Sequence, residues 1–186
     1  MTVALDFTPT DGWTTDDLDA IPDDGHRREL IDGVLHMPRS PSSYHQTVAG
    51  RLFARLDATR PDDMSANAGV EVRISTKRAL IPDVLVVKAT AAARRPAYFV
   101  PDDVLLVVEI VSPGSLTMDR VTKPALYGAA GIPLYWRIET EDGVAVTTYE
   151  LDVDSGVYRA TGEHRDTIRV ARPWQIDIPI ETLTRI

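Results

Sequence analysis

Two short apolar segments of this chain each carry a single carboxylate. They are Ile81–Val87, which contains Asp83, and Leu105–Pro113, which contains Glu109. Both segments are typical of strands buried on both faces, because they are short, rich in branched aliphatic residues and bounded by proline-containing turns. A carboxylate inside such a strand needs a cation or several hydrogen-bond donors to replace its lost hydration. The pair therefore predicts a shared divalent metal, whereas a loop cap or an arginine partner is the simpler alternative for each residue.

A lysine follows on the next predicted helix, over residues 118–130. Asp119, Lys123 and Tyr127 are spaced four residues apart there and so share one face of the helix. A helix that directly follows a strand usually packs back on its sheet, which would bring Lys123 toward the two carboxylates. A lysine in that position can orient a water molecule and offset the charge of a phosphorane-like transition state. The alternative is an exposed Asp119–Lys123 pair that stabilises the helix by about 0.3 kcal/mol.

Pro124 directly follows this lysine. Proline has no backbone N–H, and beyond the first turn of a helix its ring clashes with the preceding turn. We therefore expect the helix either to start later than residue 118 or to kink at Pro124. Either outcome would change how far the Lys123 amine reaches.

Capping, turn and periodicity signals predict the remaining elements. Asp32-Gly33 between two apolar runs favours a type I′ hairpin turn, and Val48, Leu52 and Leu56 follow the helical period. The order of elements fits an α/β (α+β) sandwich with a mixed central sheet better than a doubly wound parallel fold. In chain order the other predicted elements are a short helix at 16–21 capped by Thr14 or Thr15, a hairpin at 28–37, a helix from Ser42 or Ser43 to about Ala58, strands at 69–74 and 79–87, a surface loop or short helical segment at 89–101, a turn at 112–115, and strands at 134–138, 144–151, 157–161, 167–170 and 174–180.

The composition is that of an ordinary globular protein. With 186 residues, 44% of them hydrophobic and 26% charged, the chain is expected to form one domain, 1–186, with an N-terminal extension at 1–25 and C-terminal strands at 140–186. No apolar run approaches the roughly 20 residues that span a bilayer, and the acidic N-terminus is unlike a signal peptide, so we expect no membrane partner. The absence of cysteine excludes disulfides and thiolate zinc sites, and makes the cytoplasm the expected compartment.

The net charge of −8 bears on possible partners. Proteins that bind nucleic acid usually present a basic surface, so this charge argues against tight binding over a wide area. A bound metal and local arginines can still reverse the field within one cleft. The chain contains no P-loop, dinucleotide-binding or zincin motif, so nothing supports a nucleotide or zinc-protease reading.

The arrangement of these motifs resembles the PD-(D/E)XK nuclease superfamily. There, Asp and Glu on adjacent strands hold magnesium, and a lysine stands two positions after the Glu, where this chain has Val111. In one branch, the DUF820 or Uma2-type endonuclease family, the lysine looks as if it has moved to the following helix. The chain carries six recurrent pieces of that branch in order over roughly residues 28–138, namely Glu29-Leu30-Ile31-Asp32-Gly33, His45, Pro82-Asp83-Val84, Glu109-Ile110-Val111-Ser112-Pro113, the Asp119, Lys123 and Tyr127 triplet, and Gly131–Trp136.

The resemblance implies a restriction endonuclease-like core, in which helices flank a mixed central β-sheet with extra antiparallel strands. It implies that Asp83 and Glu109 bind Mg²⁺ or Mn²⁺ together with a backbone carbonyl, expected to be that of Ile110. Lys123 would be the catalytic lysine and Glu29 an accessory acid. DNA is then the expected substrate. Since nucleases of this architecture often pair to cut both strands, a homodimer is expected as well.

Two of these residues also have simpler explanations. His45 lies at the start of its helix on the apolar side, so it is expected to point inward, either as a structural histidine or beside the metal. An ion pair with Arg27 or Arg28 would explain Glu29 nearly as well as an accessory role does. For the whole protein, the alternative to an enzyme is a nuclease-fold module with a weakened site and a structural or regulatory role on nucleic acid, motivated by Pro124 and the net charge. A two-carboxylate glycosidase ranks last, because it requires neither the lysine nor the Pro-Asp motif.

Overall fold

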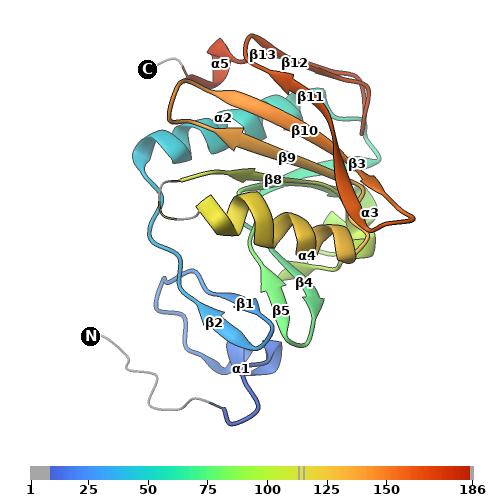
Figure 1. Cartoon of the computed structure of the whole chain (residues 1–186). Helices are drawn as coiled ribbons and strands as arrows, with labels where there is room; N and C mark the ends of the chain where they lie inside the picture. Colours follow the sequence, from blue (N-terminus) through green and yellow to red (C-terminus); the bar gives the residue numbers. More distant parts are fainter. Residues whose placement is uncertain (1–8, 113, 115, 185–186) are drawn as a thin grey trace.

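The computed structural model describes residues 9–112, 114 and 116–184 (Figure 1). Its helices are α1 (Thr15–Ala20), α2 (Ser43–Thr59), α3 (Ala89–Ala92), the 3₁₀ helix η1 (Pro101–Asp103), the π-helical turn η2 (Met118–Thr122), α4 (Lys123–Ala129) and α5 (Glu181–Thr184). Its strands are β1 (Glu29–Ile31), β2 (Val34–His36), β3 (Met64–Ala68), β4 (Glu71–Ser75), β5 (Arg78–Leu80), β6 (Val84–Lys88), β7 (Tyr98–Phe99), β8 (Val104–Ile110), β9 (Leu134–Glu139), β10 (Ala145–Asp152), β11 (Val157–His164), β12 (Thr167–Val170) and β13 (Ile176–Pro179).

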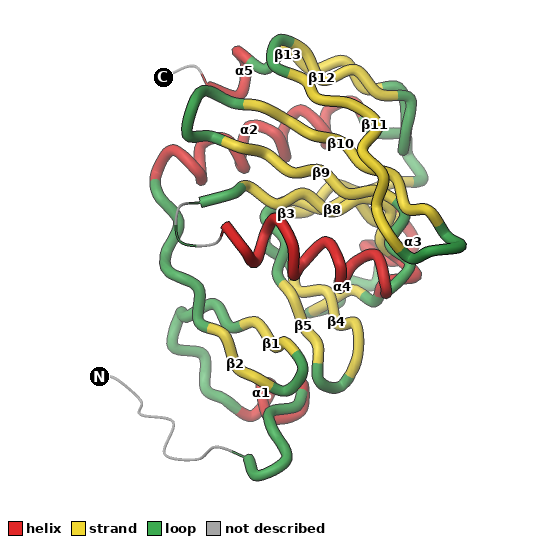
Figure 2. The backbone as a smooth tube through the Cα atoms, in the orientation of Figure 1, coloured by secondary structure: helices red, strands yellow, loops and turns green. Residues whose placement is uncertain are grey.

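The central sheet has six strands in the order β11-β10-β9-β8-β6-β3. Only β8 and β9 run parallel, so the sheet is mixed, as predicted. Helix α2 covers one face and α4 the other (Figures 1 and 2). Val84 and Val86 of β6 pack in the core on the α2 side, while Leu85 and Val87 pack on the α4 side. Because both faces are covered, the strand is continuously apolar rather than alternating.

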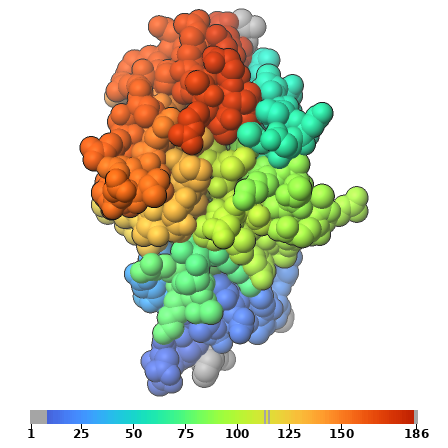
Figure 3. Space-filling model, turned by 90° about the vertical axis from the view of Figure 1, so that its right-hand side faces the viewer, coloured from blue at the N-terminus to red at the C-terminus, as the bar shows by residue number. Residues whose placement is uncertain are grey.

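A second sheet, here called the N-terminal sheet, has five strands in the order β2-β1-β5-β4-β7. It forms one end of the molecule, opposite the end built by β10 to β13 (Figures 1 and 3). The β1–β2 hairpin has the predicted type I′ character, since Asp32 and Gly33 have φ of 50° and 80°. The chain passes from this sheet to the central one between β5 and β6, at Ile81-Pro82-Asp83. Asp83 therefore lies at the join of the two sheets.

The helix that carries Lys123 contains an unusual turn. The N–H of Lys123 donates to the Met118 carbonyl five residues earlier, which makes η2 a π-helical turn. Residues 116–117 are already helical, and regular α-helix resumes at Lys123 with Pro124 in the first turn of α4, where a missing N–H costs little. The expectation that the helix starts later than residue 118 is therefore wrong, and the π-helical turn directly before Lys123 joins the two helical parts. Single π turns inside helices are frequent at functional sites.

Several predicted elements agree with the structure, including α1 with its Thr14 cap and α2 with its Ser42 cap. The strand predicted over 79–87 is instead divided into β5 and β6, because Pro82 has no N–H to donate. Strand β3 was not predicted, since its sequence contains no β-branched or aromatic residue. The predicted turn at 112–115 includes residues 113 and 115, which lie outside the described residues. Among the residues described, no helix has the length and apolar character of a membrane span.

Candidate active site

Asp83 holds the backbone on both sides of Glu109. The Asp83 N–H donates to the Val108 carbonyl at 3.1 Å, and its Oδ2 accepts from the Ile110 N–H at 2.8 Å. Both bonds form because β6 and β8 are neighbours, with Val84 opposite Val108. The two carboxylates predicted to share a site therefore lie at the same position along the central sheet.

His45 points inward from the first turn of α2, as expected, and contacts this pair. Its Nε2 lies 3.2 Å from Asp83 Oδ2 and 3.1 Å from the Ile110 carbonyl oxygen. Burial lowers the pKa of His45, but the hydrogen bond and charge of Asp83 outweigh it, so the pKa is raised above its ordinary value. Burial likewise opposes ionisation of Asp83, yet His45 and the Ile110 N–H lower the pKa of this carboxyl. His45 thus contacts Asp83 Oδ2 and the Ile110 carbonyl oxygen. The resemblance assigns both Asp83 and the Ile110 carbonyl, together with Glu109, to a metal.

Glu109 is 2% exposed, and each of its oxygens has a donor. The Tyr127 hydroxyl donates to Oε1 at 2.8 Å, and the Lys123 ammonium donates to Oε2 at 3.1 Å. Burial raises the pKa of Glu109 well above its ordinary value, while the positive charge of Lys123 opposes this shift. A further cation beside Glu109 would relieve the cost of burying its charge.

Lys123 lies among three carboxylates and is 6% exposed. Besides the Glu109 contact, its Nζ lies 2.9 Å from Glu29 Oε1 and 3.7 Å from Asp119 Oδ1. Burial alone would lower the pKa of Lys123, but the three carboxylates raise it above its usual value, so the amine is an ammonium at neutral pH. The alternative of an exposed Asp119–Lys123 pair is wrong, because Asp119 is only 4% exposed.

Glu29 comes from β1 of the N-terminal sheet and points into the site. Its Oε1 accepts from the Ile81 N–H at 2.9 Å and also contacts Lys123. The two arginines that precede it pair with other carboxylates, so they do not account for its burial. Glu29 therefore connects the N-terminal sheet to the helix that lies on the central sheet.

Two residues make contacts in the site that the sequence did not predict. Tyr127 was placed on the helix face of Lys123 by its spacing, but its bond to Glu109 was not foreseen. Arg27 was considered only as a partner of Glu29. In the structure its Nη1 lies 3.7 Å from Asp83 Oδ1 and its Nη2 donates to the Ile81 carbonyl at 2.5 Å. No sequence spacing indicates this, since Arg27 and Asp83 are joined only by tertiary contact.

The donors of the site suit a hard divalent cation. The carboxylates are those of Glu29, Asp83, Glu109 and Asp119, and the permanent cations are Arg27 and Lys123. Carboxylates thus outnumber the permanent cations, and the available metal ligands are carboxylate and carbonyl oxygens, which Mg²⁺ and Mn²⁺ prefer. Within the described part of the chain, no three or more His, Asp or Glu side chains are grouped as a ready metal cage. The chain would therefore supply few ligands, and water or substrate the others, as is usual for Mg²⁺.

The mixed sheet between two helices, with its buried acids and lysine, defines a restriction endonuclease-like fold. The Uma2 family model, described as "Putative restriction endonuclease", matches residues 15–178, and the chain belongs to this family. Its fold is also that of a crystal structure described as a putative nuclease belonging to DUF820 from Anabaena variabilis ATCC 29413. That similarity has a TM-score of 0.66 at 17% sequence identity and covers 92% of this chain and 97% of the other. No curated protein matches the chain.

Proposed function

We propose that this protein is a divalent-metal-dependent endonuclease that hydrolyses phosphodiester bonds in DNA. The observation that carries the proposal is the position of the Lys123 ammonium, 3.1 Å from the Glu109 carboxylate in a buried site beside Asp83. The family description supports nuclease chemistry in general. The choice of DNA rests on the resemblance of the motifs.

The metal ligands of the proposal are the carboxylates of Asp83 and Glu109 and the carbonyl oxygen of Ile110. A bound Mg²⁺ or Mn²⁺ would supply a nucleophilic water at neutral pH and polarise the phosphate. Asp83 fixes the Ile110 peptide through its N–H, and Tyr127 and Lys123 orient the Glu109 carboxylate. The metal-binding oxygens are thus held in place before the metal ion arrives, which lowers the free-energy cost of binding the ion.

Lys123 acts in this proposal as a fixed positive charge. Its raised pKa keeps it protonated, so it is suited to stabilising negative charge on the phosphoryl oxygens rather than to removing a proton from water. Glu29 and Asp119 hold the ammonium at the site, and both are positioning residues. A charge fixed in this way needs no reorganisation during the reaction.

The alternative of a weakened, non-enzymatic module rested partly on Pro124. Because Pro124 lies in the first turn of α4, it does not withdraw the Lys123 amine from Glu109. This geometry favours the enzyme over the module. We further propose that the protein forms a homodimer, which would allow it to cut both strands of a duplex; sedimentation of the purified protein would test this.

We also propose that the protein acts in the cytoplasm, because a chain without cysteine needs no oxidising compartment.

A substrate panel tests the proposed reaction. The wild-type protein is incubated with a supercoiled plasmid, a single-stranded oligodeoxynucleotide and an RNA of the same sequence, each with MgCl₂, MnCl₂ or EDTA. We expect internal cleavage of DNA with either metal and none with EDTA. Cleavage confined to RNA would contradict the choice of substrate, and cleavage that persists in EDTA would contradict the metal dependence.

A further inference from the structure

An open pocket of about 350 Å³ lies beside the N-terminal sheet and is lined in part by Arg27 and Ile81. It is bounded by the segment that precedes β1, by α1 and by β4. Arg27 belongs both to this pocket and to the active site, since its guanidinium also contacts Asp83. The pocket therefore adjoins the position where the scissile phosphate would lie under the proposed function.

Three arginines line the pocket together with the carboxylates of Asp19, Asp23 and Glu71, and two of the arginines are already neutralised. Arg28 forms a two-pronged pair with Asp24, with distances of 2.9 and 2.6 Å. Arg73 pairs with both Asp19 and Glu71. Neither of these guanidinium groups has its charge free for a ligand.

Arg27 differs from both. Its closest carboxylate oxygen, Asp83 Oδ1, is 3.7 Å from Nη1, which is longer than a hydrogen bond. Its Nη2 is bonded to the Ile81 carbonyl, while its Nε is buried without a hydrogen-bond partner. The Arg27 side chain is 35% exposed, so solvent reaches it from the pocket. The guanidinium is thus anchored at one nitrogen and retains both charge and donors.

We propose that this pocket receives the backbone of the DNA strand that is cut, and that Arg27 binds a phosphate adjacent to the scissile one. A guanidinium matches the geometry of phosphate oxygens and is always charged. Its anchoring to the Ile81 carbonyl fixes it two residues before Asp83, so a phosphate bound there is held in register with the catalytic carboxylates. The inference deepens the proposed function and rests on it.

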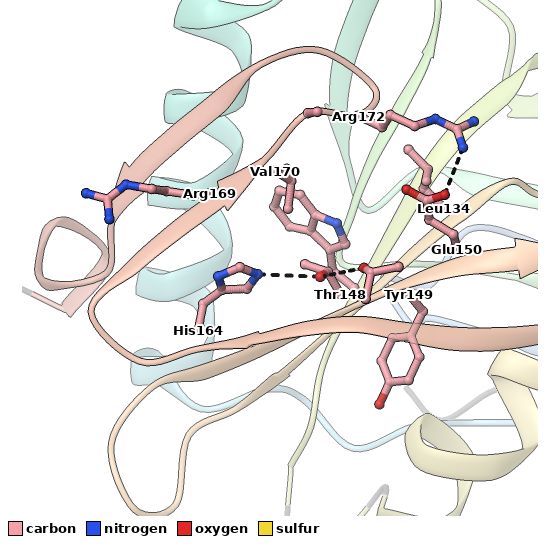
Figure 4. Close-up of a pocket in the computed structure, with 11 residues that line it drawn as sticks. Leu134, Thr148, Tyr149, Glu150, His164, Arg169, Val170 and Arg172 are labelled. Carbon is pink, nitrogen blue, oxygen red and sulfur yellow. Dashed lines mark hydrogen bonds and ion pairs between the residues drawn. The ribbon is translucent and has the colours of Figure 1, made fainter.

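A second pocket of about 210 Å³, lined by residues of β9 to β12 and the segment after β12, provides a contrast (Figure 4). It too is lined by arginines, but Arg169 pairs with Asp177 and Arg172 with Glu150. In Figure 4 the Arg172 side chain extends to Glu150, and His164 turns toward Thr148. Because the arginines of this second pocket are already paired, substitution of Arg169 is a matched control for the loss of one positive charge.

The test compares Arg27→Gln, Arg27→Lys and the control Arg169→Gln with wild type. Binding of a fluorescein-labelled duplex of about 20 base pairs is followed by anisotropy in EDTA over a series of KCl concentrations, where one phosphate contact contributes about 0.9 to the salt slope. We expect Arg27→Gln to bind about tenfold more weakly, as for a lost charged hydrogen bond, and to lower the slope by about that amount. Arg27→Lys should keep the slope, and Arg169→Gln should match wild type. Thermal unfolding verifies that each variant is folded.

Cleavage kinetics in MgCl₂ provide the second measurement. Arg27→Gln should raise KM for the duplex by a larger factor than it lowers kcat, because it removes a contact that substrate and transition state share, while Arg169→Gln should leave both constants unchanged. If wild type binds and cuts DNA but Arg27→Gln behaves like Arg169→Gln, the inference is wrong and the proposed function stands. If wild type neither binds nor cuts DNA, the proposed function is wrong and the inference is overturned with it.

Discussion

The ammonium of Lys123 lies 2.9 Å from the carboxylate of Glu29, although Glu29 belongs to the N-terminal sheet and Lys123 to a helix on the central sheet. This contact joins the two sheets at the active site. Removing one partner of a buried ion pair leaves an uncompensated charge, which costs far more than the net contribution of the pair. The cluster is therefore expected to couple folding, metal binding and catalysis.

Lys123→Met should lower kcat by about 10² to 10³, the usual loss when one preorganised donor to a transition state is removed. KM should change much less, because the lysine acts on charge that develops during the reaction. Steady-state cleavage of a duplex in MgCl₂ measures both constants. A variant that cleaves DNA at the wild-type rate would show that Lys123 has no part in catalysis.

The same variant should also be less stable without metal. Methionine leaves the buried carboxylates of Glu29, Glu109 and Asp119 without their shared cation, which should cost about 3–5 kcal/mol before any of them takes up a proton. A divalent cation supplies positive charge at the same place, so MnCl₂ should raise the Tm of Lys123→Met by more than it raises that of wild type. Equal Tm shifts in the two proteins would argue against a metal beside Glu109.

Glu29→Gln should separate charge from hydrogen bonding. The amide oxygen can still accept from the Ile81 N–H, whereas the negative charge that holds Lys123 is lost. We expect kcat to fall by about tenfold, as for a displaced supporting residue, with DNA affinity unchanged. Glu29→Ala, which loses both interactions, should in addition unfold at a lower temperature. If Glu29→Gln retains full kcat, Glu29 has no positioning role.

Tyr127→Phe removes the donor to Glu109 Oε1 and little else. Leaving that buried oxygen without its hydrogen bond should cost about 1–3 kcal/mol of stability. Loss of a residue that orients a metal ligand typically weakens metal affinity by about 10- to 100-fold. Calorimetric titration with MnCl₂ would measure the affinity, and Tyr98→Phe, at a half-exposed surface position, is the matched control. An unchanged Mn²⁺ affinity would contradict a role of Tyr127 in orienting Glu109.

Stability of the metal-free protein should depend on pH through His45 and Asp83. The pKa of His45 is raised in the folded state, so its contribution is complete below its ordinary value of about 6.5 and is lost as the pH rises through the raised pKa. The pKa of Asp83 is lowered, so its contribution is present above about 3.9 and is lost as the pH falls through the lowered value.

Their pair should therefore stabilise the fold most between about pH 4 and 6.5. His45→Gln should lower the Tm in EDTA more at pH 5.5 than at pH 9. Thermal unfolding of wild type and His45→Gln from pH 5.5 to pH 9 would measure the difference. If the difference in Tm between wild type and His45→Gln grew as the pH rose, the raised pKa of His45 and its pairing with Asp83 would be contradicted.

The sequence predicted most of the framework that positions the site. Helix α2 follows a regular apolar period, the Asp32-Gly33 turn has one favoured geometry, and both carboxylates stand in unmistakably buried runs. Strand β3 lacked such a signal, because of its five residues only Ala66 is buried. The local sequence pattern was sufficient to predict elements, such as helix α2 and the Asp32-Gly33 turn, whose conformation depends mainly on their own residues.

Contacts between distant segments were harder to predict. All three residues of β1 are buried, so no alternation indicates which way Glu29 points. The free donors of Arg27 depend on which carboxylates happen to pair with its neighbours, and those partners come from elsewhere in the chain. The burial of Lys123 depends on the N-terminal sheet supplying Glu29, which no spacing on its own helix reveals.

The most direct test of the central claim is the rate of plasmid cleavage as a function of MgCl₂ concentration for wild type, Asp83→Asn and the surface control Asp57→Asn. Asparagine keeps the shape of the side chain but removes the charge that a metal requires. Wild type and Asp57→Asn should cleave with the same saturable dependence on Mg²⁺, while Asp83→Asn should be slower by at least about 10² at every concentration. Cleavage by Asp83→Asn at the wild-type rate, or no cleavage by wild type with Mg²⁺ or Mn²⁺, would contradict the claim.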